Sequence, residues 1–196
     1  MEFALSEQQK MMQESIDGAL ARVCPLDRVR KGADSGEAHA DDVWRTLADL
    51  GIPGVLVAEE HGGLGLGMLE AALIAEILGR HVAPVPFVAT AVMAPLALMA
   101  AGTPAQQKRL LPKLASGEMK AAVAVSEHAS GARENAGVTA TDGKLSGKAL
   151  FAIDFAGADM FIVAGRERRL HLVAAGASGL STRAVPPIGG KVTLRR

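Results

Sequence analysis

The spacing of hydrophobic residues changes once along this chain, near Lys120. Before that point, apolar residues recur every three or four positions, which is the spacing of one face of an α-helix. After it, short β-branched or alternating runs are separated by glycine and Asp-Gly turns, which is typical of strands. A chain of 196 residues that is 49% hydrophobic can bury a core on both sides of this change. We therefore predict an α+β fold, with an all-helical domain over residues 1–119 and an antiparallel β domain over residues 120–196.

Five helices are expected in the first part. Ser6 and Gln9 have the spacing of a capping box, so the first helix should begin at Ser6 and end at Pro25. The polar, glycine-containing stretch 27–39 is interpreted as a loop. Four more helices are expected: from Asp41 or Asp42 to Gly51, over 67–78, over 86–101, and from Thr103 to a kink or an end at Pro112.

Six short runs predict the strands of the second part. They are AAVAV, GVTATDG, KLSGKALFAI, DMFIVAG, RLHLVAA and GLSTRAV. Each is β-branched or alternating, and each is bounded by glycine or by an Asp-Gly turn. This pattern predicts antiparallel pairing.

The segment 82–107 carries no charged residue and is long enough to span a bilayer. Three prolines, Pro84, Pro86 and Pro95, interrupt it, and alanine dominates its composition. These features favour a buried helix over a membrane span.

Charge and cysteine content exclude some functions. The 21 basic and 21 acidic residues balance, so no nucleic acid or anionic membrane is expected as a partner. A single cysteine, Cys24, excludes an intramolecular disulfide and fits a reducing compartment. The N-terminus lacks the apolar core of a signal peptide, so a cytoplasmic location is expected. His39, His81 and His171 show no metal-binding spacing, so no metal site is predicted.

Four glycines stand within residues 62–67, directly before an apolar, helix-like run. Glycine-rich loops before helices often bind phosphate. A dinucleotide fingerprint would need a third glycine where Met68 stands, and a P-loop would need a Gly-Lys-Ser/Thr sequence that this chain lacks. We interpret the loop as structural: its glycines allow positive φ angles and close approach of backbones.

Three stretches of the sequence resemble the acyl-CoA dehydrogenase family. They are LGIPGVLVAEEHGGLGLGMLEAALIAEILGRHVAPVPF, AGTPAQQKRLLPKLASGEMKAAVAVSEH and KLSGKALFAIDFAGADMFIVAG. The resemblance implies an N-terminal helical domain and part of a middle β-barrel-like domain. It also implies α,β-dehydrogenation of an acyl-CoA thioester, in which a carboxylate removes a proton and FAD accepts a hydride without a Rossmann motif.

The resemblance carries particular residues over. Val125 and Ser126 correspond to the flavin-contacting end of the family's first strand. Phe151 and Ile153 stand in the family's Trp-Ile/Val-Thr-Asn segment, which also faces the flavin and which ends here at Asp154. The resemblance therefore implies that Ser126 and Phe151 lie close together.

Substrate-binding positions carry over in the same way. Ala89 and Met93 correspond to the lining of the acyl-chain tunnel, and Ala132 corresponds to a residue near the CoA arm. The family's C-terminal helical domain, which supplies the catalytic glutamate, has no counterpart in the 196 residues. The resemblance thus implies an incomplete β domain and a catalytic base outside this chain.

Two functions stay open on these grounds. The chain is an acyl-CoA dehydrogenase or a subunit of one, acting on fatty or sterol-derived acyl groups. Alternatively, it is a non-catalytic partner that keeps the fold and lacks the base. Both alternatives imply a homo- or hetero-oligomer with a related subunit, and the first implies an electron-transfer flavoprotein as a candidate acceptor. A flavin spectrum distinguishes them.

Overall fold

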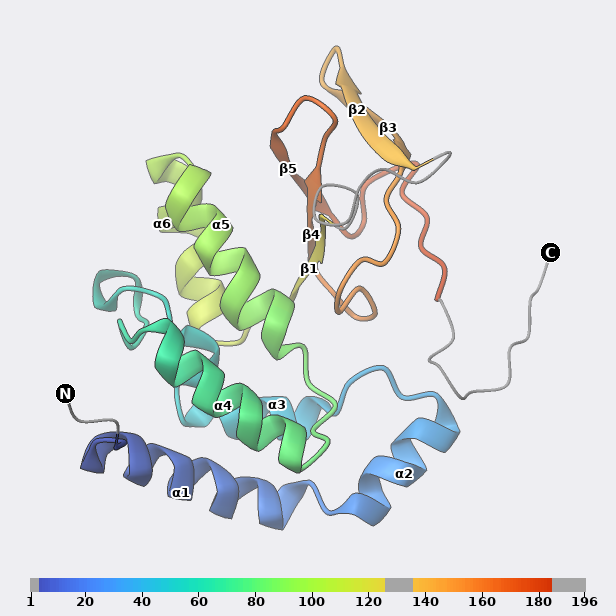
Figure 1. Cartoon of the computed structure of the whole chain (residues 1–196). Helices are drawn as coiled ribbons and strands as arrows, with labels where there is room; N and C mark the ends of the chain where they lie inside the picture. The colour runs from blue at the N-terminus through green and yellow to red at the C-terminus, as the bar shows by residue number, and fades with distance from the viewer. Residues whose placement is uncertain (1–3, 126–135, 185–196) are drawn as a thin grey trace.

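The computed structural model describes residues 4–125 and 136–184. Helices and strands occupy separate regions, with the helices in the lower and left part of Figure 1 and the strands at the upper right. The described residues form six α-helices and three short helical turns: α1 (Glu7–Val23), α2 (Leu26–Ser35), α3 (Asp41–Asp49), η1 (Ile52–Gly54), η2 (Glu59–His61), α4 (Met68–Arg80), η3 (Val88–Met93), α5 (Ala94–Ala101) and α6 (Pro104–Ala115). They also form five strands: β1 (Ala121–Ala124), β2 (Gly137–Thr141), β3 (Lys144–Lys148), β4 (Met160–Ala164) and β5 (Leu170–Ala174). The predicted α+β class is confirmed.

Two capping boxes start helices where the sequence places them. At α1, the Ser6 side chain accepts from the Gln9 N–H at 3.2 Å, and the Gln9 side chain accepts from the Ser6 N–H at 2.9 Å. The same reciprocal pair joins Thr103 and Gln106 at the start of α6. Each box satisfies backbone donors that the first turn of a helix leaves without partners.

The predicted loop over 27–39 is wrong, because α2 occupies most of it. The glycines in this stretch suggested a loop. Gly36, however, is the C-cap residue with a φ of 76°, so it marks the end of a helix and does not prevent one from forming. Val29 packs on the apolar cluster among α1, α3 and α4, and this supplies the tertiary contact that a short polar helix needs. Pro112 does not end α6, which continues to Ala115.

The described strands form one mixed sheet and one hairpin. The sheet has the order β1-β4-β5, in which β1 and β4 run parallel with Ala121 beside Met160, and β4 and β5 run antiparallel. The strands β2 and β3 form an antiparallel hairpin through a turn at Asp142 and Gly143, both with positive φ.

The prediction of purely antiparallel pairing is therefore wrong for β1 and β4. Both strands are continuously apolar and buried along their whole length, which is the pattern of parallel strands covered on two faces. The run GLSTRAV forms no strand over its described part, 179–184.

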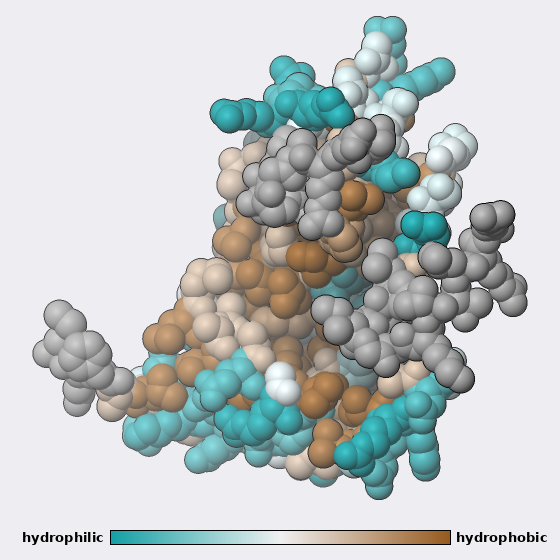
Figure 2. Space-filling model, turned by 45° about the vertical axis from the view of Figure 1, so that its right-hand side comes forward, coloured by the Kyte–Doolittle hydropathy of each residue, from teal (hydrophilic) through white to brown (hydrophobic). Residues whose placement is uncertain are grey.

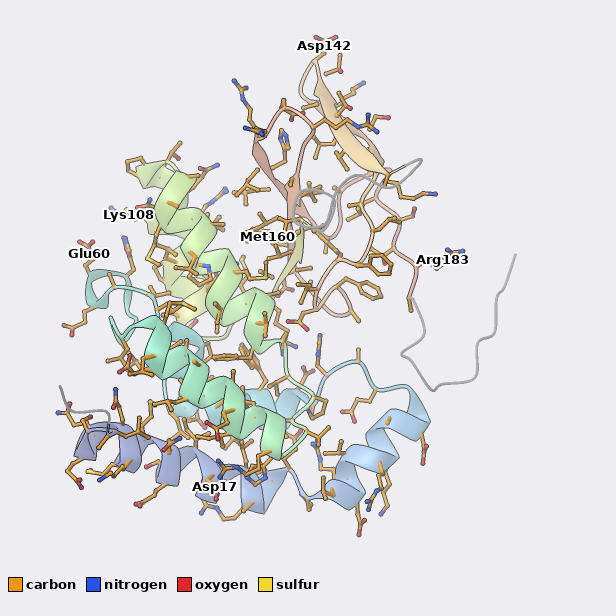
Figure 3. All side chains as sticks on the ribbon, viewed as in Figure 1. Asp17, Glu60, Lys108, Asp142, Met160 and Arg183 are labelled. Atoms are coloured by element: carbon orange, nitrogen blue, oxygen red, sulfur yellow. The ribbon has the colours of Figure 1, made fainter. Side chains whose placement is uncertain are left out.

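Two apolar clusters hold the helices. The first lies among α1, α3 and α4 and includes Leu20, Leu47 and Ile74. The second joins helices to strands, because Leu111 and Leu114 of α6 pack in the same cluster as Met160 and Ile162 of β4. Figure 3 shows Met160 at this junction of helices and strands. Strands β1 and β4 thus pack in one cluster with η3, α5 and α6, while the division into domains at 119/120 stays a prediction.

The helix predicted over 86–101 is buried on one side only, because Val88 and Leu96 are 47% and 40% exposed. Ala89, Ala91, Ala94 and Leu98 lie within the hydrophobic clusters. Within the described part of the chain, no helix combines the length and the hydrophobicity needed to cross a membrane.

Candidate functional site

The glycine loop is a structural turn, as predicted. The backbone N–H groups of residues 62–66 all donate to backbone carbonyl oxygens of residues 54–59, at 2.8–3.2 Å. The Gly67 N–H donates to the Glu70 carboxylate at 3.0 Å. A Cβ atom at Gly63 would lie 2.0 Å from the Val57 carbonyl oxygen, so this close approach of two backbones requires glycine. These N–H groups are therefore engaged within the loop and are not free to bind a phosphate.

Five of the seven predicted site residues are described, and they fall on two neighbouring parts of the fold. Ala89 and Met93 lie on η3, and Val125 directly follows β1; all three belong to the cluster that joins helices to strands. Phe151 and Ile153 lie on the segment between β3 and β4, and they are 49% and 39% exposed.

Ser126 and Ala132 lie outside the described residues. The predicted closeness of Ser126 and Phe151 therefore stays a prediction. The assignment of the seven residues to flavin and substrate likewise stays a prediction.

The segment 150–154 is strained and held from one side by β1. Phe151 and Asp154 have φ angles of 53° and 54°, in the left-handed region that side chains other than glycine rarely adopt. Ile153 and Val123 exchange two backbone hydrogen bonds, of 2.9 and 3.2 Å, in an isolated antiparallel bridge. Strained residues persist where their surroundings fix them, and such positions cluster at functional sites.

The helical side of the candidate site begins with η3, which is a π-helical turn. Such turns are rare and are frequent at functional sites. Thr90, in the middle of this turn, is completely buried, and its hydroxyl accepts from the Ala121 N–H at 3.0 Å and donates to the Ala121 carbonyl at 3.3 Å. One turn of helix is therefore bonded to the first residue of β1.

Asp154 connects the strained segment to the same turn. Its carboxylate accepts a hydrogen bond from the Ala89 N–H at 3.1 Å. Burial raises the pKa of this carboxyl group, while the Ala89 hydrogen bond and the nearby His39 ring act in the opposite direction. The Nε2 atom of His39 is buried and has no hydrogen-bond partner among the described residues.

An apolar groove of about 440 Å³ lies next to the start of η3. It opens between α2, the end of α4 and the segment 82–88, and Glu37 is its charged lining residue. Val82 lines it with a φ of 49°, which is unusual for a β-branched residue. Sequence reasoning missed this groove because the sequence predicts a loop where α2 lies; Val29, an apolar residue in a polar stretch, is the signal that points to the helix.

Hydrophobic side chains also gather in the middle of the face drawn in Figure 2, between hydrophilic upper and lower rims. An apolar face of this kind suits an apolar ligand or the surface of another protein. Within the described residues, no three histidine, cysteine or acidic side chains are grouped to hold a metal ion. The apolar surface of the described residues therefore suits binding of an apolar group.

Comparison with known proteins identifies the class. A family model described as "Acyl-CoA dehydrogenase, N-terminal domain" matches residues 6–118. The chain belongs to the acyl-CoA dehydrogenase family.

Individual relatives agree with this assignment. The chain is 32% identical over 171 residues to the mitochondrial isobutyryl-CoA dehydrogenase of Dictyostelium discoideum, covering 86% of this chain and 39% of the relative. It is 32% identical over 112 residues to acyl-CoA dehydrogenase IpdE2 of Mycobacterium tuberculosis, covering 57% of this chain and 34% of the relative.

Among solved structures, the ChsE4-ChsE5 complex from Mycobacterium tuberculosis matches with a TM-score of 0.81 and 27% identity, covering 94% of this chain and 52% of that one. A steroid acyl-CoA dehydrogenase, the Tcur3481-Tcur3483 G363A variant, matches with a TM-score of 0.76 and 34% identity over 89% of this chain and 50% of that one. The chain thus spans about half of these solved chains and less of the two sequence relatives above.

Proposed function

We propose that this chain forms part of an FAD-dependent acyl-CoA dehydrogenase that introduces an α,β double bond into an acyl-CoA thioester. Family membership supports the reaction class. The observation that carries the site is the strained segment 150–154, which presents two apolar side chains while being bonded to the helix of Ala89 and Met93.

The residues of this segment fit a flavin. Phe151 and Ile153 are exposed to about half and two fifths, so they offer an aromatic and an aliphatic surface to a flat ring. FAD, when bound, supplies the acceptor for the hydride that leaves the substrate. Phe151 and Ile153 then orient the ring and exclude water from one side of it.

Met93, which is half-buried, would contact the acyl group from the helical side, with the fully buried Ala89 behind it. Both belong to an apolar cluster, so they favour an uncharged chain or ring and exclude water around it. The apolar groove beside the start of η3 adds room for a bulky end of that group. We therefore propose a fatty or sterol-derived acyl group as the substrate class.

The proton at the α-carbon needs a base within hydrogen-bond reach of that carbon. Asp154 does not serve as this base, because its carboxylate is partly buried and bonded to the Ala89 N–H. We propose that the base lies outside this chain. A related subunit would then complete the active site, and an electron-transfer flavoprotein in the cytoplasm would accept the electrons.

A second function has its own support. Ile153 stands where the family resemblance places a hydroxyl-bearing threonine, so the chain lacks a polar group expected near the flavin. Two of the matched structures, ChsE4-ChsE5 and Tcur3481-Tcur3483, are each named for two gene products. The chain would then be a non-catalytic subunit that supports a catalytic one.

The test measures flavin and turnover together. The purified chain, alone and co-expressed with a related acyl-CoA dehydrogenase subunit, is given FAD, an artificial electron acceptor and a series of acyl-CoA thioesters. We expect a flavin absorbance spectrum and turnover only in the co-expressed sample. Glu127, the acidic residue directly after Ser126 in the sequence, is the alternative base to test. Turnover by the chain alone that is lost in Glu127→Ala would place the base in this chain, and a flavin-free complex that still assembles would favour the non-catalytic subunit.

A further inference from the structure

The turn η3 is bonded to the β region through two separate hydrogen-bonded contacts, one to β1 and one to the segment between β3 and β4. The Thr90 hydroxyl takes both the N–H and the carbonyl of Ala121, at 3.0 and 3.3 Å. At the first residue of β1, the Thr90 side chain therefore makes the backbone hydrogen bonds that a neighbouring strand makes elsewhere in the sheet. Because Thr90 is fully buried, water cannot replace it if the hydroxyl is removed.

The second contact comes from a different segment. The Asp154 carboxylate accepts from the Ala89 N–H at 3.1 Å, close to the start of the continuous helix that runs through η3 and α5. A carboxylate at this end of a helix satisfies a donor of the first turn and interacts favourably with the helix dipole. Asp154 thus caps a helix from 65 residues further along the chain.

The two contacts close a loop of bonds through three elements. Asp154 follows Ile153, which is bridged to Val123 of β1, and β1 begins at Ala121, which is bonded to Thr90. The helix, the strand and the strained segment therefore cannot shift singly without breaking a bond of the loop. The φ angle of 54° at Asp154 is held by the bond to Ala89 on one side and the bridge at Ile153 on the other.

We propose that Asp154 and Thr90 are positioning residues, which hold the helix of Ala89 and Met93 at a fixed place against the segment of Phe151 and Ile153. This inference rests on the proposed function in one respect: there, Met93 on this helix contacts the acyl group, and Phe151 and Ile153 contact the flavin. Fixing their separation fixes the distance between the substrate carbon and the flavin, and transfer between them depends steeply on that distance.

The first test follows backbone hydrogen exchange by mass spectrometry in the full chain. Asp154→Ala removes the cap, whereas Asp154→Asn keeps an acceptor oxygen of the same size. We expect Asp154→Ala to speed exchange at least tenfold in both segments, 88–93 and 150–154, and Asp154→Asn to leave both within twofold of the parent. Asp34→Ala, which removes an exposed carboxylate on α2, is the matched control and should change neither.

Thr90 is tested in the same way. Thr90→Val removes the hydroxyl at nearly constant volume and should speed exchange at the start of β1 as well as in η3, whereas Thr90→Ser should not. Faster exchange in only one of the two segments of Asp154→Ala would show that the contact does not couple them and would overturn the inference. If Asp154→Ala does not fold, Asp154→Gly removes the same carboxylate without strain at a positive φ, and its exchange decides the question.

The second test separates this inference from the proposed function. FAD is titrated into the assembled protein and followed by quenching of its fluorescence, and we expect Asp154→Ala to weaken binding at least tenfold and Asp154→Asn less than twofold. If Asp154→Ala shows faster hydrogen exchange but binds flavin as tightly as the parent, the positioning role is overturned and the proposed function stays intact. A parent that binds no flavin would overturn the proposed function, and the coupling would be judged from hydrogen exchange alone.

Discussion

Replacing Gly63 by alanine should strongly destabilise the protein, although the change adds a single methyl group. The added Cβ would lie 2.0 Å from the Val57 carbonyl oxygen and 2.5 Å from its Cβ, so one backbone must move by more than an ångström. That movement breaks the neighbouring bonds from Leu64 to Gly54 and from Gly65 to Val57. Two lost bonds at about 1 kcal/mol each and an overpacking cost of about 1–3 kcal/mol predict a loss of about 3–5 kcal/mol.

Gly79→Ala is the matched control, since it makes the same chemical change in the next helix. A Cβ atom at Gly79 meets nothing within 4 Å, and its backbone is helical. Alanine is the better helix former there, so we expect a gain of about 0.5–1 kcal/mol. The two variants should therefore shift stability in opposite directions.

Urea denaturation followed by circular dichroism measures both changes. With a slope of roughly 2 kcal/mol per molar urea, the midpoint of Gly63→Ala should fall by roughly 2 M and that of Gly79→Ala should rise slightly. A Gly63→Ala midpoint within 0.3 M of the parent, a limit of about 0.6 kcal/mol on the same slope, would refute the close approach of the two backbones. Added phosphate or nucleotide should not restore the lost stability, because the loop N–H groups are used internally.

Three further changes test other contacts. Burial raises the folded-state pKa of Asp154 above its unfolded value of about 3.9. The stability that the protonated carboxyl group contributes is therefore lost as pH rises through the folded-state pKa. The neutral Asp154→Asn variant should have a higher urea midpoint than the parent at pH 7 but not at pH 4. Val82→Gly relieves a φ of 49° at an exposed residue and should stabilise by about 1 kcal/mol in the same urea assay; an unchanged urea midpoint would count against strain there. Trp44→Phe loses the 3.0 Å bond from the indole N–H to the Gly117 carbonyl and should cost about 1–2 kcal/mol, measured by thermal melting.

Much of the helical part could be predicted because its signals are local. The capping boxes at Ser6 and Thr103 act over three residues, so the sequence alone locates both helix starts. The helix α2 was missed for the opposite reason: its own residues are polar, and its stability comes from packing of Val29 on a core built elsewhere.

The strands and the site depended on contacts between distant residues. Continuous apolar runs in β1 and β4 indicated burial, but their parallel pairing joins residues 39 positions apart, such as Ala121 and Met160, and no local pattern specifies it. The placement of Phe151 and Ile153 came from family resemblance and not from periodicity. The bond from Asp154 to Ala89 could not be predicted, since neither residue carries a signal of the other.

The cluster shared by α6 and β4 has a consequence during synthesis on the ribosome. Leu111 and Leu114 emerge well before Met160 and Ile162, the strand residues that cover them in the finished fold. At about 5–20 residues per second, the 45 residues from Ala115 to Met160 take roughly 2–9 s to make. For that time the nascent chain exposes an apolar helical surface, which is the kind of surface that chaperones bind. Slowing translation over this stretch should therefore increase aggregation of the newly made protein more than slowing it before α6.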